Sequence, residues 1–334
     1  MSYESLHNHT TASDGLQTHA EVLATAAACG VGTVAFTDHD SLPTPAELAA
    51  LKAYSGHVKW LIGCEITSGL PRELGGGATS MFHILGLFTD PTDTALLQHC
   101  RLAGAARTER MERIVTNLRG LGFTISADDC LKASGGEVVG RPHIVQALRM
   151  HPGNDAIIEA IRADMGQAAV SSPAVAMDYM RMMERDKSDY PYRLFLSDDA
   201  FLPGVYVDYL YVIDMDKSVA LIRAAGGAAV LAHWPTVSRK LKADLLEKLL
   251  AERRLDGVEL RSGYFDSEVG RSERELAAMA ERTGALTTYG IDGHRQKDIE
   301  HFVADAQLAA KSVGQTAKLM QRLQPDLAWS NLGT

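Results

Sequence analysis

Long apolar runs and paired cysteines are both missing from the sequence. No stretch approaches the about 20 apolar residues that a membrane-spanning helix needs, and the N-terminus lacks a basic segment followed by an apolar run. The four cysteines are widely spaced and form no CxxC pair, which favours reduced thiols without a metal role. These absences predict a soluble, cytoplasmic protein with no membrane partner.

Positive charge is also scarce. The 334 residues include 33 lysines and arginines against 42 aspartates and glutamates, which gives a formal net charge of −9. This balance argues against a protein that holds a long nucleic-acid duplex on a broad basic surface. A phosphorylated partner should therefore be small, and its positive charge must be supplied locally.

Short apolar, β-rich runs alternate with alanine-rich helical patterns, which is typical of a parallel sheet covered by helices. The expected strands lie within residues 4–10, 33–40, 60–67, 81–88, 228–235, 257–263 and 286–294. Nearly every run ends in a polar or ligating side chain. Because the carboxyl ends of strands in a closed parallel barrel meet on one face, the pattern predicts a barrel-like α/β domain with its site on that face.

The alternation stops between about residue 95 and residue 215, where the sequence is mostly helical in pattern. We therefore expect residues 1–95 and 215–334 to form the barrel domain. Residues 96–214 are expected to form an inserted helical subdomain or lid.

Nine candidate metal ligands lie at the ends of the expected strands. They are His7, His9, Asp14, His39, Glu65, His83, His233, Asp292 and His294. An open cluster of imidazoles and carboxylates of this size can hold several divalent cations, which indicates hydrolytic chemistry on an anionic substrate. These ligand types suit Mn, Fe and Zn alike.

The individual signals differ in strength. His7 and His9 are two apart on a strand and so point to the same side, while Asp38 and Asp40 are expected to orient imidazoles or hold the turn around His39. Glu65 ends an apolar strand, where a carboxylate is costly unless it is paired or metal-bound, and it could bridge two cations.

His83 is ambiguous by itself, because a lone histidine in an apolar strand is more often a satisfied core residue than a ligand. Its candidacy as a ligand depends on the other members of the set. Independent structural explanations for all nine placements are possible, but one shared metal site explains them together.

In chain order, the motifs HNHTTASDG, TDHD, GCE, HILG, RPH, AHW and DGH resemble the PHP family, named for its polymerase and histidinol phosphatase members. The resemblance covers most of the chain and implies a distorted (β/α)7 barrel holding three divalent metal ions. It implies one ion on His7, His9, Glu65 and Asp292, a second on Glu65, His83 and His233, and a third on Asp14, His39 and His294. Trp234 and Ile291 stand where the family usually has proline and serine, which bears on substrate preference rather than on the ligands.

The helical insertion with RPHIVQAL resembles the family's stand-alone phosphoesterases that act on nucleoside 3′,5′-bisphosphates or, as 5′-to-3′ exoribonucleases, on short RNA. Arg141 and His143 could supply positive charge and a hydrogen bond to a phosphate, although RPH could equally just begin a helix. Arg107 and Arg110 could meet a second phosphate, although such a run is usually a solvated helix face. Trp234 could stack a base, with core packing as the alternative.

The predicted activity is metal-dependent hydrolysis of a phosphate ester of a nucleotide, by attack of a metal-bound hydroxide. His233 or His143 could protonate the leaving group, and the choice between them stays open. The alternatives are the same chemistry on another small substrate, such as a cyclic sugar phosphate or histidinol phosphate, and a non-catalytic scaffold module. The sequence leaves the oligomeric state open.

Overall fold

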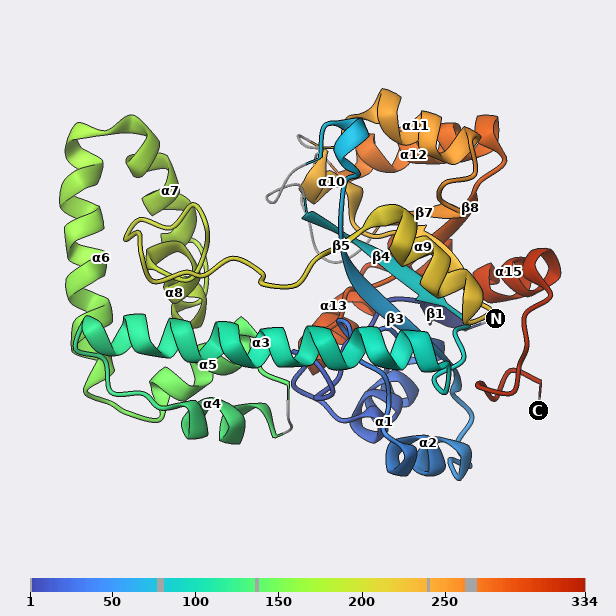
Figure 1. Cartoon of the computed structure of the whole chain (residues 1–334), viewed down its shortest axis with the longest axis horizontal. Coiled ribbons are helices and arrows are strands. Elements are labelled where there is room, and N and C mark those ends of the chain that lie inside the picture. The colour runs from blue at the N-terminus through green and yellow to red at the C-terminus, as the bar shows by residue number, and fades with distance from the viewer. Residues whose placement is uncertain (1, 77–80, 136–137, 239–240, 262–268, 334) are drawn as a thin grey trace. The chain divides into compact units, whose positions relative to one another are not determined.

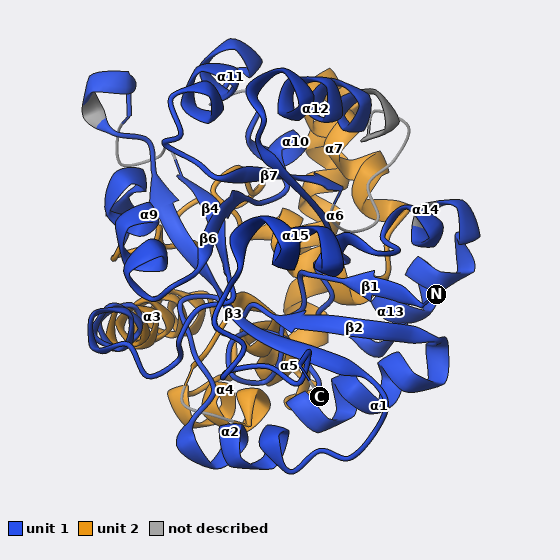
Figure 2. Cartoon of the chain, turned by 90° about the vertical axis from the view of Figure 1, so that its right-hand side faces the viewer, with its two compact units in different colours: residues 1–103, 212–334 blue, residues 104–211 orange. Residues whose placement is uncertain are grey.

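The computed structural model describes residues 2–76, 81–135, 138–238, 241–261 and 269–333, so residues 262 and 263 of one expected strand lie outside the described part. The chain divides into two compact units. Unit 1 contains residues 1–103 and 212–334, and unit 2 contains residues 104–211 (Figure 2). Among the described helices, none is both long enough and apolar enough to cross a membrane.

Unit 1 is built on an eight-stranded sheet with helices packed around it (Figure 1). Its strands are β1 (Tyr3–Ser5), β2 (Val31–Phe36), β3 (Lys59–Gly69), β4 (Met81–Leu87), β6 (Ala228–Leu231), β7 (Gly257–Arg261) and β8 (Leu286–Tyr289), in that spatial order, with β5 (Ile213–Asp214) beside β3. Its helices are α1 (His19–Cys29), α2 (Pro45–Lys52), α9 (Met215–Ala224), α10 (Trp234–Val237), α11 (Ala243–Ala251), α12 (Val269–Thr283), α13 (Gln296–Ala304), α14 (Ala306–Lys311) and α15 (Gln315–Leu323).

The sheet closes into a ring between its first and last strands through residues just beyond them. The Leu6 amide donates to the Tyr289 carbonyl at 3.1 Å, and the His9 amide donates to the Gly293 carbonyl at 2.8 Å. Asn8 and Gly293 form a parallel bridge at the same seam. The distorted barrel expected from the sequence is confirmed.

One strand runs against the rest, which corrects the expectation of a parallel sheet. β4 is antiparallel to both β3 and β6, whereas β1, β2, β3, β6, β7 and β8 pair in parallel. Strand direction is not encoded in an apolar run, so the pattern alone could not reveal this reversal. Its consequence is that the beginning of β4, and not its end, lies at the site.

Alternate residues along the strands face the barrel interior, as the two-residue period of a strand requires. The interior cluster contains Leu61 of β3, Leu85 and Leu87 of β4, and Val230 of β6. Leu319 of α15 packs into the same cluster, and Figure 2 shows α15 lying across the near end of the strands. One end of the barrel is therefore filled with apolar side chains, and the other end is available for polar groups.

Local signals explain where the helices before the site begin. Thr18 caps α1 and Thr44 caps α2, each in a reciprocal capping box with the glutamate three residues on. Gly30 ends α1 with φ of 77°, a left-handed conformation that glycine adopts without strain.

Unit 2 is helical, as expected for the insertion. It contains the part of α3 (Thr94–Gly120) from residue 104 on, followed by α4 (Ala127–Ser134), α5 (Arg141–Arg149), α6 (Asn154–Ser171), α7 (Pro173–Met183) and α8 (Tyr190–Leu194). It has a hydrophobic core of its own, which includes Leu118, Leu148 and Phe195.

Candidate metal centre

The structure brings the nine candidate ligands together at one end of the unit 1 barrel. Three overlapping groups have ligand atoms that all lie within 4.8 Å of one another. The groups are His7 with His9, Glu65 and Asp292; His9 with Asp14, His39 and His294; and His39 with Glu65 and His83. His233 joins the third group through contacts with Glu65 and His83 at 3.0 and 3.2 Å.

Glu65 lies at the centre of the cluster, on β3 and fully buried. Its Oε2 is 3.2 Å from the Nε2 atoms of His7 and His9 and 3.0 Å from His39 Nδ1. Its Oε1 is 3.1 Å from His83 Nδ1 and 3.0 Å from His233 Nε2. The two oxygens thus face two different sets of imidazoles, which is the geometry that a bridging carboxylate requires.

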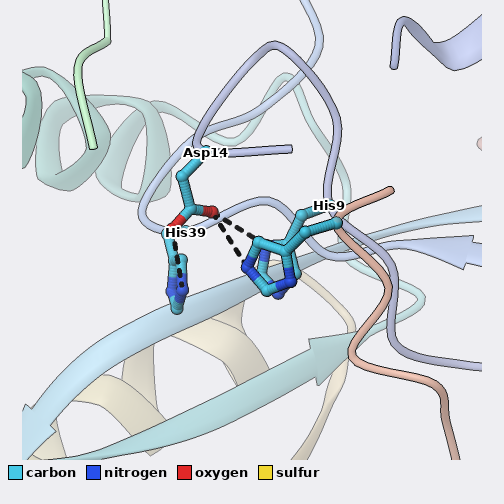
Figure 3. A group of neighbouring side chains, drawn as sticks. His9, Asp14 and His39 are labelled. Atoms are coloured by element: carbon cyan, nitrogen blue, oxygen red, sulfur yellow. Dashed lines mark ion pairs between the residues drawn. The ribbon is translucent and has the colours of Figure 1, made fainter. Parts of the chain in front are cut away.

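The carboxylate of Asp14 belongs to the second group, with His9, His39 and His294. It lies between the rings of His9 and His39, at 3.7 and 3.9 Å (Figure 3). His294 Nε2 approaches it more closely, at 3.3 Å. The His294 Nδ1 contacts the Asp292 carbonyl at 2.9 Å, which turns its Nε2 toward Asp14.

Asp292 completes the first group from the seam of the barrel. Its Oδ1 is 3.1 Å from His9 Nε2 and 3.4 Å from His7 Nε2. Its backbone has φ of 52°, and His233 and Asp40 also have positive φ values, of 28° and 43°. Such conformations cost about 1–3 kcal/mol each in non-glycine residues and persist where the surrounding structure fixes them. Strain therefore gathers at the end of the barrel where these side chains converge.

The two aspartates that flank His39 hold loops. Asp38 accepts hydrogen bonds from the Thr10 amide and the Ser13 hydroxyl at 2.7 and 2.6 Å. Asp40 accepts from the Thr67 amide at 2.9 Å and contacts His99 Nε2 at 2.9 Å. Both therefore fix the backbone that carries the cluster. Asp38 holds the loop that carries His9 and Asp14, and Asp40 holds the strand that carries Glu65.

Glu259 of β7 is a further residue of the cluster that was not among the predicted site residues. This glutamate is 1% exposed, and its Oε1 is 3.1 Å from His7 Nδ1. Its Oε2 accepts a hydrogen bond from the His233 amide at 3.0 Å. The signal was available, because Glu259 sits in an apolar strand in the same way as Glu65, but Glu259 lies outside the motifs that carry the family resemblance, whereas Glu65 lies in GCE.

Burial and the charges of neighbouring side chains shift the pKa values of these groups in opposite directions. Burial alone would raise the pKa of Glu65, but the charge of the His7 imidazole helps to hold that pKa well below its ordinary value. The pKa of Asp14 is likewise lowered, against the effect of burial, mainly by His294. Both carboxylates are therefore ionised at neutral pH.

The imidazoles divide into two kinds. Burial would lower the pKa of His9, but hydrogen bonds to Asp292 and Glu65 outweigh it and raise that pKa to about 10. For His39 burial prevails over the attraction of Glu65 and Asp14 and lowers the pKa to about 3. The metal-free cluster thus holds a proton on His9 and a neutral ring on His39.

The donor set fits divalent cations. Nitrogen and carboxylate ligands of this kind are accepted by Mn, Fe and Zn. The Nε2 atoms of His7 and His9 lie 3.1 Å apart, and each lies 3.2 Å from Glu65 Oε2. The buried His39 Nδ1 lies 3.0 Å from Glu65 Oε2 yet makes no hydrogen bond to any described residue. These atoms point to common centres more than to one another, as metal ligands do.

The predicted substrate residues of unit 2 gather around tyrosines. Arg107 and Arg110 are only 7% and 6% exposed, so the interpretation of a solvated helix face is wrong for both. The Arg110 guanidinium lies 4.3 Å from the ring centroid of Tyr209, and Arg107 lies 5.8 Å from it. Arg141 lies 5.9 Å from the Tyr206 ring, which Arg110 also approaches. Arg110 Nη2 has no hydrogen-bond partner among the described residues.

His143 and Trp234 are both buried. His143 Nδ1 accepts the Gly140 amide at 3.1 Å, so the RPH motif does begin a helix, α5. The role of His143 toward a substrate stays a prediction. Trp234 is 5% exposed in the main core of unit 1, and its indole N–H donates to the Leu241 carbonyl at 2.8 Å. Trp234 thus packs in the core, and its role toward a substrate stays a prediction.

Comparisons with known proteins agree with this geometry. The family model of the PHP domain matches residues 5–181. A 3′,5′-nucleoside bisphosphate phosphatase of Chromobacterium violaceum is 27% identical over 293 residues, covering 86% of each chain. The 5′-3′ exoribonuclease Rnm of Escherichia coli is 25% identical over 295 residues, covering 87% of this chain and 84% of its own.

Solved structures resemble the fold over a similar length. A Bifidobacterium adolescentis protein, inferred to be a metal-dependent phosphoesterase, superposes with a TM-score of 0.63 at 25% identity and covers 87% of each chain. An amidohydrolase from Chromobacterium violaceum gives a TM-score of 0.61 at 24% identity over 88% of each chain, which supports the fold.

Metal loading is expected to release protons at neutral pH. His9 is protonated below its pKa of about 10 in the metal-free site, whereas a ligating nitrogen must be unprotonated. Asp14 and Glu65 have lowered pKa values and are already ionised, so they release none. We expect at least one proton released per chain, and Mn²⁺ affinity that rises from about pH 6 to about pH 9. Calorimetric titration in buffers of different ionisation enthalpy measures this release, and a slope of zero would contradict it.

Proposed function

Because the chain belongs to the PHP domain family and hydrolyses phosphate esters with the help of metal ions, we propose that its substrate is a nucleotide. The substrate class is a nucleoside 3′,5′-bisphosphate or a short 5′-phosphorylated RNA. The observation that carries this proposal is the arginine cluster of unit 2, in which Arg107 and Arg110 are buried and Arg141 is partly buried. The names of the relatives support it, since one acts on a nucleoside bisphosphate and another is an exoribonuclease.

Three divalent ions, drawn from Mn, Fe and Zn, are proposed for the barrel end. One is held by His7, His9, Glu65 and Asp292, a second by Glu65, His83 and His233, and a third by Asp14, His39 and His294. The division of Glu65 contacts between its two oxygens supports the first two sites. When bound, such ions polarise phosphoryl oxygens and acidify coordinated water.

Other groups of unit 1 hold the ligand nitrogens in place. His7, His233 and His294 each have a second ring contact, to Glu259, the Thr236 hydroxyl and the Asp292 carbonyl respectively. A ring fixed at one nitrogen presents the other nitrogen in a defined direction and tautomer. The cluster is thus organised before a substrate arrives, which is what catalysis by positioned charge requires.

The arginine cluster of unit 2 is suited to bind a phosphate group. A buried guanidinium with an unpaired Nη2 is costly unless an anion meets it, and arginine matches phosphate through two parallel N–H groups. The adjacent rings of Tyr206 and Tyr209 offer π faces to the same guanidinium.

His143 and His233 remain the two proposed proton donors to the leaving group. His233 Nε2 faces Glu65 and its Nδ1 faces the Thr236 hydroxyl, so both of its nitrogens are engaged. His143 Nδ1 accepts the Gly140 amide, which places the proton of a neutral ring on Nε2. The choice between the two donors stays open.

A panel of phosphate esters tests the substrate class. With Mn²⁺ added, we expect turnover of a 3′,5′-bisphosphonucleoside or a 5′-phosphorylated oligoribonucleotide to exceed that of a cyclic sugar phosphate and of histidinol phosphate. Released phosphate and nucleotide products are measured, with Asp14→Ala as the impaired control. Equal rates on all four would overturn the nucleotide proposal, and no turnover of any ester by metal-loaded protein would favour the scaffold alternative.

Two ligand variants test the grouping of the ions. Glu65→Gln is expected to lose two ions per chain, because its two oxygens face separate sets of imidazoles. Asp14→Asn is expected to lose only one. Metal content after dialysis is measured by mass spectrometry, with Glu273→Gln as the control, since Glu273 is a buried glutamate that contacts Tyr289 and Lys311 instead. Equal losses in the two ligand variants would contradict the bridged arrangement.

Substitution of Arg110 tests the second-phosphate contact. Arg110→Ala is expected to lower kcat/KM for a bisphosphonucleoside by about 10- to 100-fold, since a hydrogen bond to a charged group contributes about 1.5–3 kcal/mol. Activity on p-nitrophenyl phosphate, which has a single phosphate, should be retained. Arg113→Ala is the matched control on the same helix, because Arg113 is exposed and paired with Glu109. A similar loss on both substrates would indicate a structural role for Arg110.

A further inference from the structure

Glu259 contacts two of the candidate ligands at once. Its two oxygens lie 3.1 and 3.3 Å from His7 Nδ1, and Oε2 also accepts the His233 amide at 3.0 Å. His7 and His233 come from opposite parts of the chain, beyond β1 and beyond β6. The carboxylate on β7 therefore connects the two segments behind the cluster.

The contact with His7 determines which ring nitrogen carries a proton. A carboxylate accepts hydrogen bonds, so it fixes the His7 proton on Nδ1 and leaves the lone pair of a neutral ring on Nε2. That Nε2 faces Glu65 Oε2 at 3.2 Å and Asp292 Oδ1 at 3.4 Å. The nitrogen directed into the cluster is thus the one able to bind a cation.

The contact with His233 fixes a strained backbone. His233 has φ of 28°, outside the regions that a residue with a Cβ ordinarily adopts. The hydrogen bond from its amide to Glu259 holds this conformation, in which His233 Nε2 lies 3.0 Å from Glu65 Oε1. Without the carboxylate, the chain after β6 would lose a contact that opposes its relaxation.

The surroundings of Glu259 are built to admit it. At Gly290, which follows β8, a Cβ would lie 2.3 Å from His7 Cβ and 2.7 Å from Glu259 Oε1. Only glycine leaves room there for the two side chains to meet. A buried carboxylate is costly by itself, so its presence here needs a use, and orienting ligands is the use that these contacts support.

We propose that Glu259 is a positioning residue that sets the ligand geometry of two metal ions, the one on His7 and the one on His233, and not of the ion on Asp14, His39 and His294. This role rests on the proposed function, because it requires the three-ion arrangement. Glu259 contacts one ligand on each side of Glu65, namely His7, which faces Oε2, and His233, which faces Oε1.

Glu259→Gln is the sharpest variant, because it keeps the size of the side chain. Either orientation of the new amide turns an N–H donor toward His7 Nδ1 or toward the His233 amide, where an acceptor is needed. We expect Mn²⁺ affinity at two of the three sites to fall about 10- to 100-fold, the range for loss of such outer contacts. The third site should keep its wild-type affinity.

The tautomer of His7 gives a readout independent of activity. In ¹⁵N-histidine-labelled, Zn²⁺-loaded protein, wild type should show His7 protonated on Nδ1, assigned by comparison with His7→Gln. Glu259→Gln should lose or shift that signal. Glu259→Asp retains the buried charge but withdraws the carboxylate by one methylene, and it should weaken the same two sites if the role depends on reach.

Glu273→Gln again serves as the matched control, and the melting temperature of each metal-free protein shows whether it is folded. Wild-type binding of three ions together with unchanged binding by folded Glu259→Gln and Glu259→Asp would overturn the positioning role alone. Loss of all three ions in folded Glu259 variants, or of the same two ions in Glu273→Gln, would also overturn it. Wild-type protein that binds no ion would instead overturn the proposed function, and this role with it.

Discussion

One buried carboxylate organises the end of the barrel where function is expected. Glu65 is fully buried, and five imidazoles lie within 3.2 Å of its two oxygens. An ion removed from water costs several kcal/mol unless its surroundings compensate it. Here the compensation comes from side chains on separate parts of the sheet, so the architecture must deliver all of them to one point. The antiparallel direction of β4 and the seam between β1 and β8 can both be understood from that requirement.

The backbone around Glu65 is as constrained as its side chain. Its amide donates to the Asp38 carbonyl, and its carbonyl accepts the Asp40 amide at 2.8 Å. Asp40 in turn adopts a positive φ and accepts a hydrogen bond from the amide of Thr67, two residues beyond Glu65. The loop carrying His39 is therefore attached to β3 on both sides of the carboxylate. A rigid centre of this kind suits electrostatic catalysis, where the charged groups should not have to rearrange during the reaction.

The sequence predicted the ligand set because its members interrupt apolar strands with polar groups that have no other use there. The barrel and the helical character of the insertion also followed from periodicity and from the family resemblance. The direction of β4 did not, although His83 gave a clue: it stands at the start of its apolar run, whereas Glu65 and His233 stand at the ends. Glu259 was overlooked because it belongs to none of the motifs that carry the family resemblance, although it interrupts an apolar strand as Glu65 does. For Trp234 the sequence left substrate stacking and core packing open, because an aromatic residue beside a ligand looks the same in either role, and the structure shows its ring in the core.

The seam of the barrel joins the two extremes of the chain. His9 and Asp292 are separated by 283 positions, yet their side chains are 3.1 Å apart. During synthesis the first histidines leave the ribosome long before Asp292 and His294 exist. The N-terminal carboxylates and imidazoles are therefore synthesised before the barrel can close. The cluster can be completed only after the last strand has been made. A cation held there, as proposed, would link the first and last segments, and closing so long a loop would restrict the unfolded chain as a covalent link does.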